Sequence, residues 1–297
     1  MSDQREKEDL AVFESHRPAL VGLAYRMLGD VGRAQDMVQE AWLRWHRREV
    51  AVESPKAFLV TIVTRLCLNE LDSARARREE SRGDRLPEPV SLEEGGLSRV
   101  EELEQLSMAI LVVLERLTPA ERAVLLLHEV FEFPHQEIAK LVARTPAACR
   151  KLLARARQRV SDGRRLITAS PEEHGRLLDA FLRAASAGDQ EALKDLLAAD
   201  AVLITDGGPE GRALAGLRNL RRPLEGAAQV AAFVAAASRR VELEVEPREL
   251  NGQPALVFYR DEQPFAAVLL AVAQGKIQRI FFHADPARLR HLGGRRG

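Results

Sequence analysis

A polar stretch between residues 79 and 96, EESRGDRLPEPVSLEEGG, divides the chain, because Pro87, Pro89 and paired glycines interrupt it. Such a composition is typical of a linker. On both sides of it, apolar residues recur at intervals of three and four, which is the spacing of amphipathic helices. The chain has 297 residues, enough for two or three domains. We therefore predict two all-α domains, 8–78 and 98–168, joined by a linker, 79–97.

A third block, 171–297, has a different pattern. Its start carries the signals of a helix N-terminus, with Ser170 as the capping residue and Pro171 in the first turn. Two short helices are expected at 174–187 and 190–198, and strand-like runs follow, with Asn251-Gly252 as a hairpin turn. The runs cover 201–205, 241–250, 255–260, 265–273 and 276–284. Helices followed by an antiparallel meander predict an α+β domain.

The charge of the whole chain is balanced, with 44 Lys and Arg against 44 Asp and Glu. This balance argues against a protein that binds nucleic acid over its entire surface. The positive charge is local instead. It gathers at the end of the first block, in Arg75, Arg77 and Arg78, and again between Lys140 and Arg165. If DNA is a partner, these two places are where we expect it.

Cysteine usage and the N-terminus bound the compartment. Cys67 and Cys149 lack metal-ligand spacing, so we expect reduced thiols, no zinc site and no other cofactor. The N-terminus is charged where a signal peptide would be apolar, and no run reaches the roughly 18–20 apolar residues of a membrane span. These features favour a soluble, cytoplasmic protein.

Within the first block, the segment 36–45 forms a helix whose apolar residues, including Val38 and Trp45, share one arc that faces the core. The opposite face carries Asp36, Gln39, Glu40 and Leu43. A leucine among acidic and amide groups on an exposed face is a modest sign of a protein partner. A solvated face with one stray apolar residue explains the pattern equally well.

The next helix, 55–78, is apolar over most of its surface and carries a polar stripe. The stripe contains Thr61, Arg65, Asn69 and Asp72 and continues into Arg75. These side chains suit contacts with phosphates and exposed bases. Arginines at a helix C-terminus also complement the helix dipole, which is a common structural role.

A helix-turn-helix pattern occupies the end of the second block. A short buried helix around Ile138 is followed by Thr145 as cap and Pro146 in the first turn of a second helix. On that second helix, Cys149 belongs to the buried arc. The opposite arc presents Ala147, Arg150, Lys151, Arg155 and Gln158, small and basic residues that suit entry into the major groove.

Both helical blocks, in this order, resemble the second and fourth domains of extracytoplasmic-function sigma factors. The matching text is LAYRMLG from residue 23, DMVQEAWLRW from 36, SPKAFL from 54, LTPAERAV from 117, and the helix-turn-helix. The resemblance covers about residues 8–166. It implies a protein that directs bacterial RNA polymerase to promoters, with core polymerase and promoter DNA as partners.

The resemblance also implies a role for each surface. Asp36, Val38, Gln39, Glu40 and Leu43 would mark the helix that docks on core polymerase. Thr61, Arg65, Asn69 and Arg75 would lie beside the opened −10 element. Thr145, Ala147, Arg150, Lys151 and Arg155 would read the −35 element.

The third block resembles the cone-shaped SnoaL-like domain that one subgroup of these sigma factors carries at the C-terminus. Three motifs bear the likeness: LPEPV from residue 86, DGGPE from 206, where the family has DGGGK, and DPARL from 285, where it has NPDKL. The resemblance implies a built-in regulator that contacts the sigma domains. The expected regulatory contacts are Pro87, Pro89, Asp206, Gly207, Gly208, Asp285 and Pro286.

Two other functions fit parts of the sequence. An isomerase-like enzyme would place a catalytic group in the third block, but Asp206 suits a turn and Tyr259 has no evident partner, so we assign no catalytic residue. A helix-turn-helix regulator with a ligand-binding domain would leave the first block unexplained.

Overall fold

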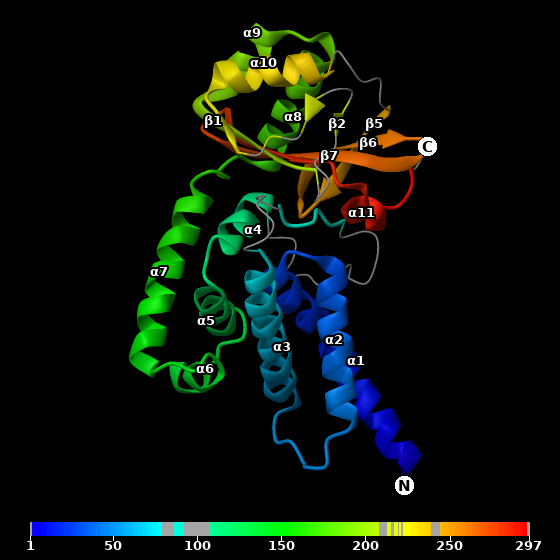
Figure 1. Ribbon diagram of the computed structural model, residues 1–297, viewed down its shortest axis with the longest axis vertical. Helices are drawn as coiled ribbons and strands as arrows, with labels where there is room; N and C mark the ends of the chain where they lie inside the picture. The colour runs from blue at the N-terminus through cyan, green and yellow to red at the C-terminus, as the bar shows by residue number, and fades with distance from the viewer. Residues whose placement is uncertain are drawn as a thin grey trace. The chain divides into compact units, whose positions relative to one another are not determined.

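The structure, a computed structural model, describes residues 2–78, 86–91, 107–207, 213–214, 217–218, 220, 222–238 and 244–295 (Figure 1). The contacts between residues divide this described part into two compact units. One contains residues 2–78 and 113–161, and the other contains residues 86–91, 107–112 and 162–295. No helix in the described ranges is long and apolar enough to cross a membrane.

The first unit opens with three packed helices, α1 (Ser2–Leu28), α2 (Val31–His46) and α3 (Pro55–Arg78). Asp30 caps α2 by accepting a hydrogen bond from the backbone N–H of Arg33 at 2.9 Å. Trp45 is buried at the end of α2, and its Nε1 donates to the carbonyl of Asp9 at 3.0 Å. This bond and the tilted contact between Phe13 and Trp42 join α1 to α2.

The same unit contains α5 (Pro119–Glu129), α6 (His135–Leu141) and most of α7 (Pro146–Arg164). Thr118 and Glu121 form a reciprocal capping box at the start of α5, which satisfies backbone donors that the helix leaves open. Helix α5 packs against α1 and α3. Arg122 of α5 is 5% exposed and donates to the carbonyl of Met27 at the end of α1.

The second unit is built on a mixed sheet of six strands in the order β4-β1-β8-β7-β6-β5. The strands are β1 (Leu197–Asp206), β4 (Leu224–Glu225), β5 (Glu244–Leu250), β6 (Gln253–Arg260), β7 (Gln263–Ala273) and β8 (Lys276–His283). Strands β5 to β8 form the predicted antiparallel meander, but β1 pairs with β8 in parallel, so the expectation of an antiparallel arrangement was wrong for that pair. The short strands β2 (Ala213–Leu214) and β3 (Leu217–Arg218) pair with each other.

Helices cover one face of this sheet (Figure 1). They are α8 (Pro171–Ala187), α9 (Gln190–Leu196) and α10 (Ala227–Ser238). Ser170 caps α8 as predicted, accepting from the N–H of Glu173 at 3.2 Å. The sequence did not predict α10, whose text AAQVAAFVAAAS is rich in alanine rather than amphipathic. Its Val230 and Ala231 are fully buried against the helix-facing side of the sheet.

The other face of the sheet is covered by segments from three distant parts of the chain. They are the linker residues from Leu86, the start of α4 (Met108–Glu115), and the C-terminal tail with α11 (Pro286–Leu289) and the 3-10 turn Arg290–Leu292. Strand alternation separates the two faces, so that Leu256 lies under the helices while Val257 and Tyr259 lie under the linker and tail. The linker is therefore part of a hydrophobic core.

Candidate functional site

The polar stripe of α3 lies on the solvent side of the first unit. Arg65 and Asn69 are exposed and Thr61 is half-buried, whereas Val63 and Cys67 between them are fully buried. The stripe therefore presents donors and acceptors outward from a rigid helix. The side chain of Arg75 lies outside the described residues.

On α2, Asp36, Gln39 and Leu43 are exposed, and Leu43 shows 39% of its surface. Glu40 is half-buried and pairs with Arg44 one turn later at 2.9 Å. Val38 is 2% exposed. Its assignment to a docking surface is corrected, because the side chain packs in the core, as helical geometry alone predicts.

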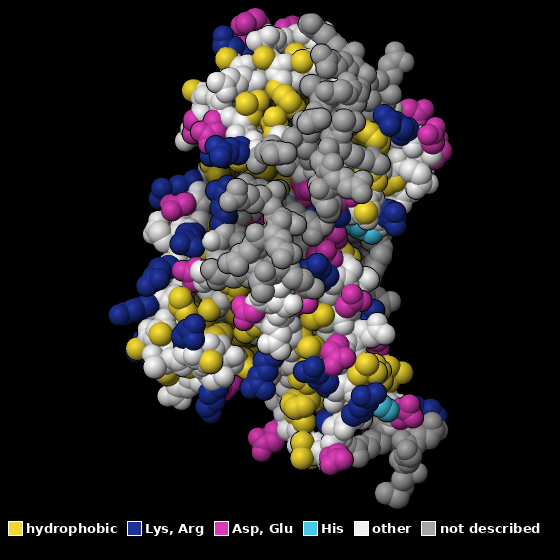
Figure 2. All heavy atoms as spheres, in the orientation of Figure 1, with side chains coloured by type: hydrophobic (Ala, Val, Ile, Leu, Met, Phe, Trp, Pro, Cys, Tyr) yellow, Lys and Arg dark blue, Asp and Glu magenta, His cyan; other side chains and the backbone are white. Residues whose placement is uncertain are grey.

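Helix α7 presents a basic face. Thr145 caps it, accepting from the N–H of Ala148 at 3.2 Å, and Cys149, Leu153 and Ala156 are buried on one side. The residues predicted to face DNA are all exposed, namely Thr145, Ala147, Arg150, Lys151 and Arg155. Lys and Arg side chains accordingly gather along α7 on the face seen in Figure 2.

Two further arginines on α7 orient the helix instead of presenting donors outward. Arg157 pairs with Glu129 at 2.6 Å, and Arg159 lies 3.2 Å from Glu121, the capping residue of α5. Both ion pairs join α7 to α5 beside the basic face. Sequence patterning did not single out either pair, because each joins residues that are far apart in the chain.

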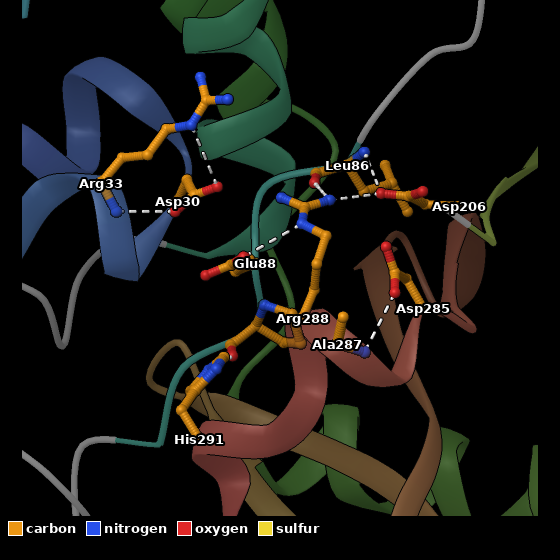
Figure 3. A network of polar contacts seen from close by, with 10 residues as sticks. Asp30, Arg33, Leu86, Glu88, Asp206, Asp285, Ala287, Arg288 and His291 are labelled. Atoms are coloured by element: carbon orange, nitrogen blue, oxygen red, sulfur yellow. Dashed lines mark hydrogen bonds and ion pairs between the residues drawn. The ribbon is translucent and has the colours of Figure 1, made fainter. Parts of the chain in front are cut away.

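A second site lies in the C-terminal unit, where the linker residues Leu86–Ser91 are all buried. Figure 3 shows Arg288 of α11 between this segment and the end of β1. Its Nη1 donates to the carbonyl of Leu86 at 2.6 Å and to the carboxylate of Asp206, and its Nε donates to Glu88 at 3.1 Å. Asp206 also accepts from the backbone N–H of Leu86 at 3.0 Å. One guanidinium thus joins the linker to both β1 and the tail.

Two more residues hold the backbone of the same segment. Asn251 accepts from the N–H of Val90 through Oδ1 at 3.1 Å and donates its own N–H to the carbonyl of Val90 at 2.8 Å. The Nε2 of His291 lies 2.6 Å from the carbonyl of Pro89. We name Asp206, Asn251, Arg288 and His291 the linker cradle, and we name Leu86–Ser91 the buried linker segment.

The electrostatics of the cradle depend on Arg288, which is only 9% exposed and faces two buried carboxylates, Asp206 and Glu88. A buried charge is tolerated only when it is paired and hydrogen-bonded. Loss of that side chain would therefore take a buried cationic partner from both carboxylates.

The predicted regulatory residues lie around this cradle. Pro87 and Pro89 are buried in the linker segment, and Asp206 and Gly207 are buried at the end of β1. Asp285 caps α11, accepting from Ala287 at 3.1 Å, and Pro286 begins that helix. Gly208 lies outside the described residues. Asp206 was expected to serve a turn, and this expectation is corrected because its carboxylate binds the linker and Arg288.

Sequence reasoning did not single out Arg288, Asn251, His291 or Glu88. Glu88 lies in the LPEPV motif and Arg288 in the DPARL motif. Their opposite charges were the one sequence signal of a contact between the two motifs. Asn251 fits a hairpin turn, and its positive φ of 53° agrees with that role. The bond to Val90, 161 residues away in sequence, leaves no local trace.

Other polar groups on the linker-facing side of the sheet are also committed to structure. Tyr259, which has no evident partner in sequence, accepts from Arg248 at 2.8 Å, and Arg248 also donates to the carbonyl of Leu292 at 3.4 Å. His283 is 3% exposed. Burial, with the nearby charges of Arg288 and His291, lowers its pKa to about 3, so the imidazole is neutral at physiological pH.

The cysteines are structural residues. Cys67 and Cys149 are both buried and reduced. Burial raises the pKa of each thiol, which suppresses the reactive thiolate. Among the described residues, no group of three or more His, Cys, Asp or Glu side chains is placed to hold a metal ion.

Comparison with known proteins bears on both units. The family model of Sigma-70 region 2 matches residues 12–77, and that of Sigma-70 region 4 matches residues 107–160. The chain is 33% identical to the ECF RNA polymerase sigma factor SigJ of Mycobacterium tuberculosis, a match that covers 94% of this chain and 92% of SigJ. This chain belongs to the extracytoplasmic-function sigma factors.

The probable ECF RNA polymerase sigma factor SigI of the same species is 31% identical and is matched over 94% of each chain. The crystal structure of SigJ superposes with a TM-score of 0.72 at 29% identity, covering 95% of this chain and 98% of SigJ. The match extends through the third domain, so the predicted order of two all-α sigma domains and an α+β SnoaL-like domain is confirmed.

Membership of the sigma factor family establishes what the protein does. The protein is a sigma factor that directs RNA polymerase to promoters, and its partners are core polymerase and promoter DNA. Sigma factors are initiation factors rather than enzymes, so the isomerase-like alternative is set aside. The alternative of an ordinary helix-turn-helix regulator is set aside as well, because it gives no place to Sigma-70 region 2.

Proposed function

We propose that the C-terminal domain restrains this sigma factor by holding the buried linker segment between regions 2 and 4. The observation that carries the proposal is the burial of all six residues Leu86–Ser91 in the unit that contains the C-terminal domain. Free linkers stay in water because their backbone polar groups need partners. Here the cradle supplies those partners.

Chain length makes the restraint quantitative. An extended chain spans at most about 3.3–3.6 Å per residue, so the residues between Arg78 and Met108 could reach roughly 105 Å if they were free. With Leu86 held, the end of α3 can lie no more than roughly 28 Å from the cradle. Met108 packs in the same hydrophobic cluster as Leu86, and its N–H donates to Gln253. The held linker therefore keeps the ends of the two sigma regions close.

Promoter geometry requires the two sigma regions to lie far apart. The elements at −35 and −10 are separated by about 25 base pairs, or roughly 85 Å of duplex at about 3.4 Å per base pair. In the first unit, α5 of region 4 packs on α1 and α3 of region 2. A freed linker lets the two regions move much farther apart than a held linker does, so we infer that release of the segment favours promoter recognition.

We assign the contacts of the open state to residues on the outward-facing sides of α2, α3 and α7. Asp36, Gln39, Glu40 and Leu43 on α2 dock on core polymerase. Thr61, Arg65, Asn69 and Arg75 on α3 contact the −10 element. Thr145, Ala147, Arg150, Lys151 and Arg155 contact the −35 element. The support is their outward position on α2, α3 and α7, except for Arg75, which rests on the family resemblance alone.

We place the domain boundaries at 8–78, 79–97, 98–168 and 171–297, supported by the ranges that the two sigma-region models match. We also place the protein in the cytoplasm, because core RNA polymerase and promoter DNA are found there in bacteria. The second placement is tested by fractionating cells that express a tagged full-length chain, with core polymerase as the marker.

The regulatory proposal is tested with Arg288→Lys in the full chain. Lysine keeps the charge but cannot provide the fork of donors that reaches Leu86, Glu88 and Asp206 together. We expect this variant to raise promoter-specific transcription with core polymerase several-fold. The matched control is Arg290→Lys, an exposed position two residues away, which should transcribe like the parent.

A distance measurement accompanies the transcription assay. Glu14→Cys on α1 and Gln136→Cys on α6 are exposed and can be labelled, because the two native thiols are buried. Energy transfer between the labels should fall in Arg288→Lys and stay unchanged in Arg290→Lys. Truncation after Ala284 removes both Arg288 and His291. It should lower energy transfer and raise transcription more than Arg288→Lys does. Unchanged transcription and unchanged transfer in both altered chains would refute the restraint.

A further inference from the structure

The cradle recognises the main chain of its occupant more than its side chains. Backbone groups of Leu86, Pro89 and Val90 bond to Asp206, Arg288, His291 and Asn251. Asn251 bonds both the N–H and the carbonyl of Val90, as an adjacent strand would do. Main-chain bonds with side-chain selection are the usual basis of extended-peptide recognition. Another chain of the same shape would make the same bonds.

The side chains of the occupant define which chain would fit. Leu86 and Val90, on either side of the Pro-Glu-Pro sequence, are 2% and 1% exposed, and Leu86 belongs to the hydrophobic cluster under the sheet. Glu88 at the centre places its carboxylate on Arg288. Pro87 and Pro89 lack N–H groups, so they can be buried without a lost hydrogen bond. The chemistry selected is apolar, proline, acid, proline, apolar.

We propose that the linker cradle is a peptide-binding site that also accepts, from a separate protein, an extended segment of this same chemistry. Such a segment displaces the buried linker segment and releases regions 2 and 4. This inference rests on the proposed restraint and adds the kind of partner that relieves it, a protein that presents an acidic residue between two prolines with apolar residues outside them.

Competition with the linker sets the affinity that a partner needs. A tethered segment acts at an effective concentration on the order of millimolar. A partner making only the cradle contacts must therefore approach millimolar concentration to displace half of the linker. A partner that makes further contacts outside the cradle, worth a thousand-fold in affinity, would do so at about micromolar concentration.

The binding test uses a fluorescein-labelled peptide with the sequence of residues 84–92, DRLPEPVSL, and two hosts. In the full chain carrying Leu86→Ser and Val90→Ser, the tethered segment is weakened and the peptide should bind with a Kd in the micromolar range. In the parent chain the same anisotropy signal should need at least a hundred-fold more peptide. A peptide carrying Glu88→Lys should bind at least ten-fold more weakly.

Matched substitutions in the weakened host locate the binding. Adding Arg288→Lys should reduce peptide binding at least ten-fold, and adding Arg290→Lys should leave it unchanged. If the doubly substituted host does not fold by circular dichroism, a host with Glu88→Lys, which keeps both apolar anchors, replaces it. A folded host that shows no binding at millimolar peptide, or equal binding with and without Arg288→Lys, overturns the inference.

Transcription assays distinguish the peptide-binding inference from the proposed restraint by the C-terminal domain. If Leu86→Ser with Val90→Ser raises transcription but the peptide does not bind, the restraint stands and recognition of a separate protein falls. If the peptide binds and raises transcription by the parent chain at millimolar concentration, both stand. Binding without any change in transcription would retain the peptide site and refute the release of regions 2 and 4.

Discussion

Helix α7 and the linker cradle both depend on arginine, and they use it in opposite ways. Arg150 and Arg155 are exposed on α7, so their donors are directed at something outside the chain. Arg288 is buried, and its donors reach two carboxylates and a carbonyl of the same chain. An exposed arginine contributes little to the fold and much to binding. A buried arginine with several partners does the reverse.

This contrast predicts which property each substitution changes. Substitutions on the exposed faces of α2 and α7 should alter binding at constant stability. Substitutions in the cradle should alter stability and transcription together, because the cradle acts by holding part of its own chain.

The largest effect is expected on α2. Asp36→Arg with Glu40→Arg should abolish detectable holoenzyme formation at micromolar concentration, because two charges are reversed on the proposed docking face, a net change of four units. The fold should survive, since Asp36 is exposed and the Glu40–Arg44 pair lies at the surface, where ion pairs contribute only about 0–1 kcal/mol. Gel filtration with core polymerase and thermal unfolding measure the two properties.

A matched control for α2 is Asp179→Arg with Glu191→Arg, which makes the same change in charge at exposed positions on α8 and α9. This control should still bind core polymerase. A docking variant that melts well below the control would show instead that the α2 face is structural.

On α7, Arg150→Ala and Arg155→Ala should each weaken binding of the holoenzyme to a −35 element by about 1–3 kcal/mol if the contact is bidentate to a base. Arg157→Ala, on the same helix, should cost less, because that side chain is engaged with Glu129. Promoter titrations at one fixed salt concentration measure all three. Equal losses in the three variants would mean that the helix contributes only general positive charge.

On the buried side, His283 predicts a pH dependence. Its pKa is lowered to about 3 in the folded chain by burial and by the charges of Arg288 and His291, against about 6.5 when unfolded. Below pH 6.5 the unfolded chain binds a proton that the folded chain does not bind, so stability falls as the pH falls toward 3. Between pH 6.5 and pH 5 this should cost about 2 kcal/mol.

The measurement is chemical unfolding of the full chain at several pH values, followed by a signal from the C-terminal unit. His283→Gln removes the titrating group and should flatten the decline, whatever its effect on stability at neutral pH. The control His46→Gln removes an exposed imidazole and should leave the slope of the parent. A slope in His283→Gln as steep as that of the parent would assign the dependence to other groups.

The contrast between exposed and buried sites also explains what the sequence could predict. The exposed faces of α2, α3 and α7 follow from helical periodicity, which is local, so Arg65 and Arg150 were placed correctly on the solvent side. The exception is Val38, where helical geometry predicted burial and the family resemblance suggested a surface. The prediction from helical geometry was correct, because a residue can belong to the motif of a docking helix and still face the core instead of the partner.

The remaining features depend on contacts between distant residues. The parallel pairing of β1 with β8 joins segments that are far apart in the chain, and strand periodicity carries no information about partners. Helix α10 consists mainly of alanine, so it lacks the alternation of polar and apolar residues that marks an amphipathic helix. The linker was identified by its prolines, but its burial follows only from residues that the tail and β1 bring to it.

The smallest effect sharpens the contrast at the level of one hydrogen bond. Asn251 has φ of 53°, a left-handed conformation that glycine adopts without strain and alanine does not. Asn251→Gly therefore removes the side-chain acceptor for the N–H of Val90 and keeps the backbone bond to the carbonyl of Val90. A buried donor left without a partner costs about 1–3 kcal/mol, so the held state should lose at least about 1 kcal/mol, or roughly five-fold in population. Hydrogen exchange in the peptide that contains Val90 should rise by a similar factor, with a smaller rise in transcription than in Arg288→Lys.

Asn251→Ala adds backbone strain to the loss of the same hydrogen bond, so its folded state should be about 1 kcal/mol less stable than that of Asn251→Gly. If Asn251→Gly exchanges like the parent, the Val90 bond does not hold the linker, and the restraint must come from Arg288 alone.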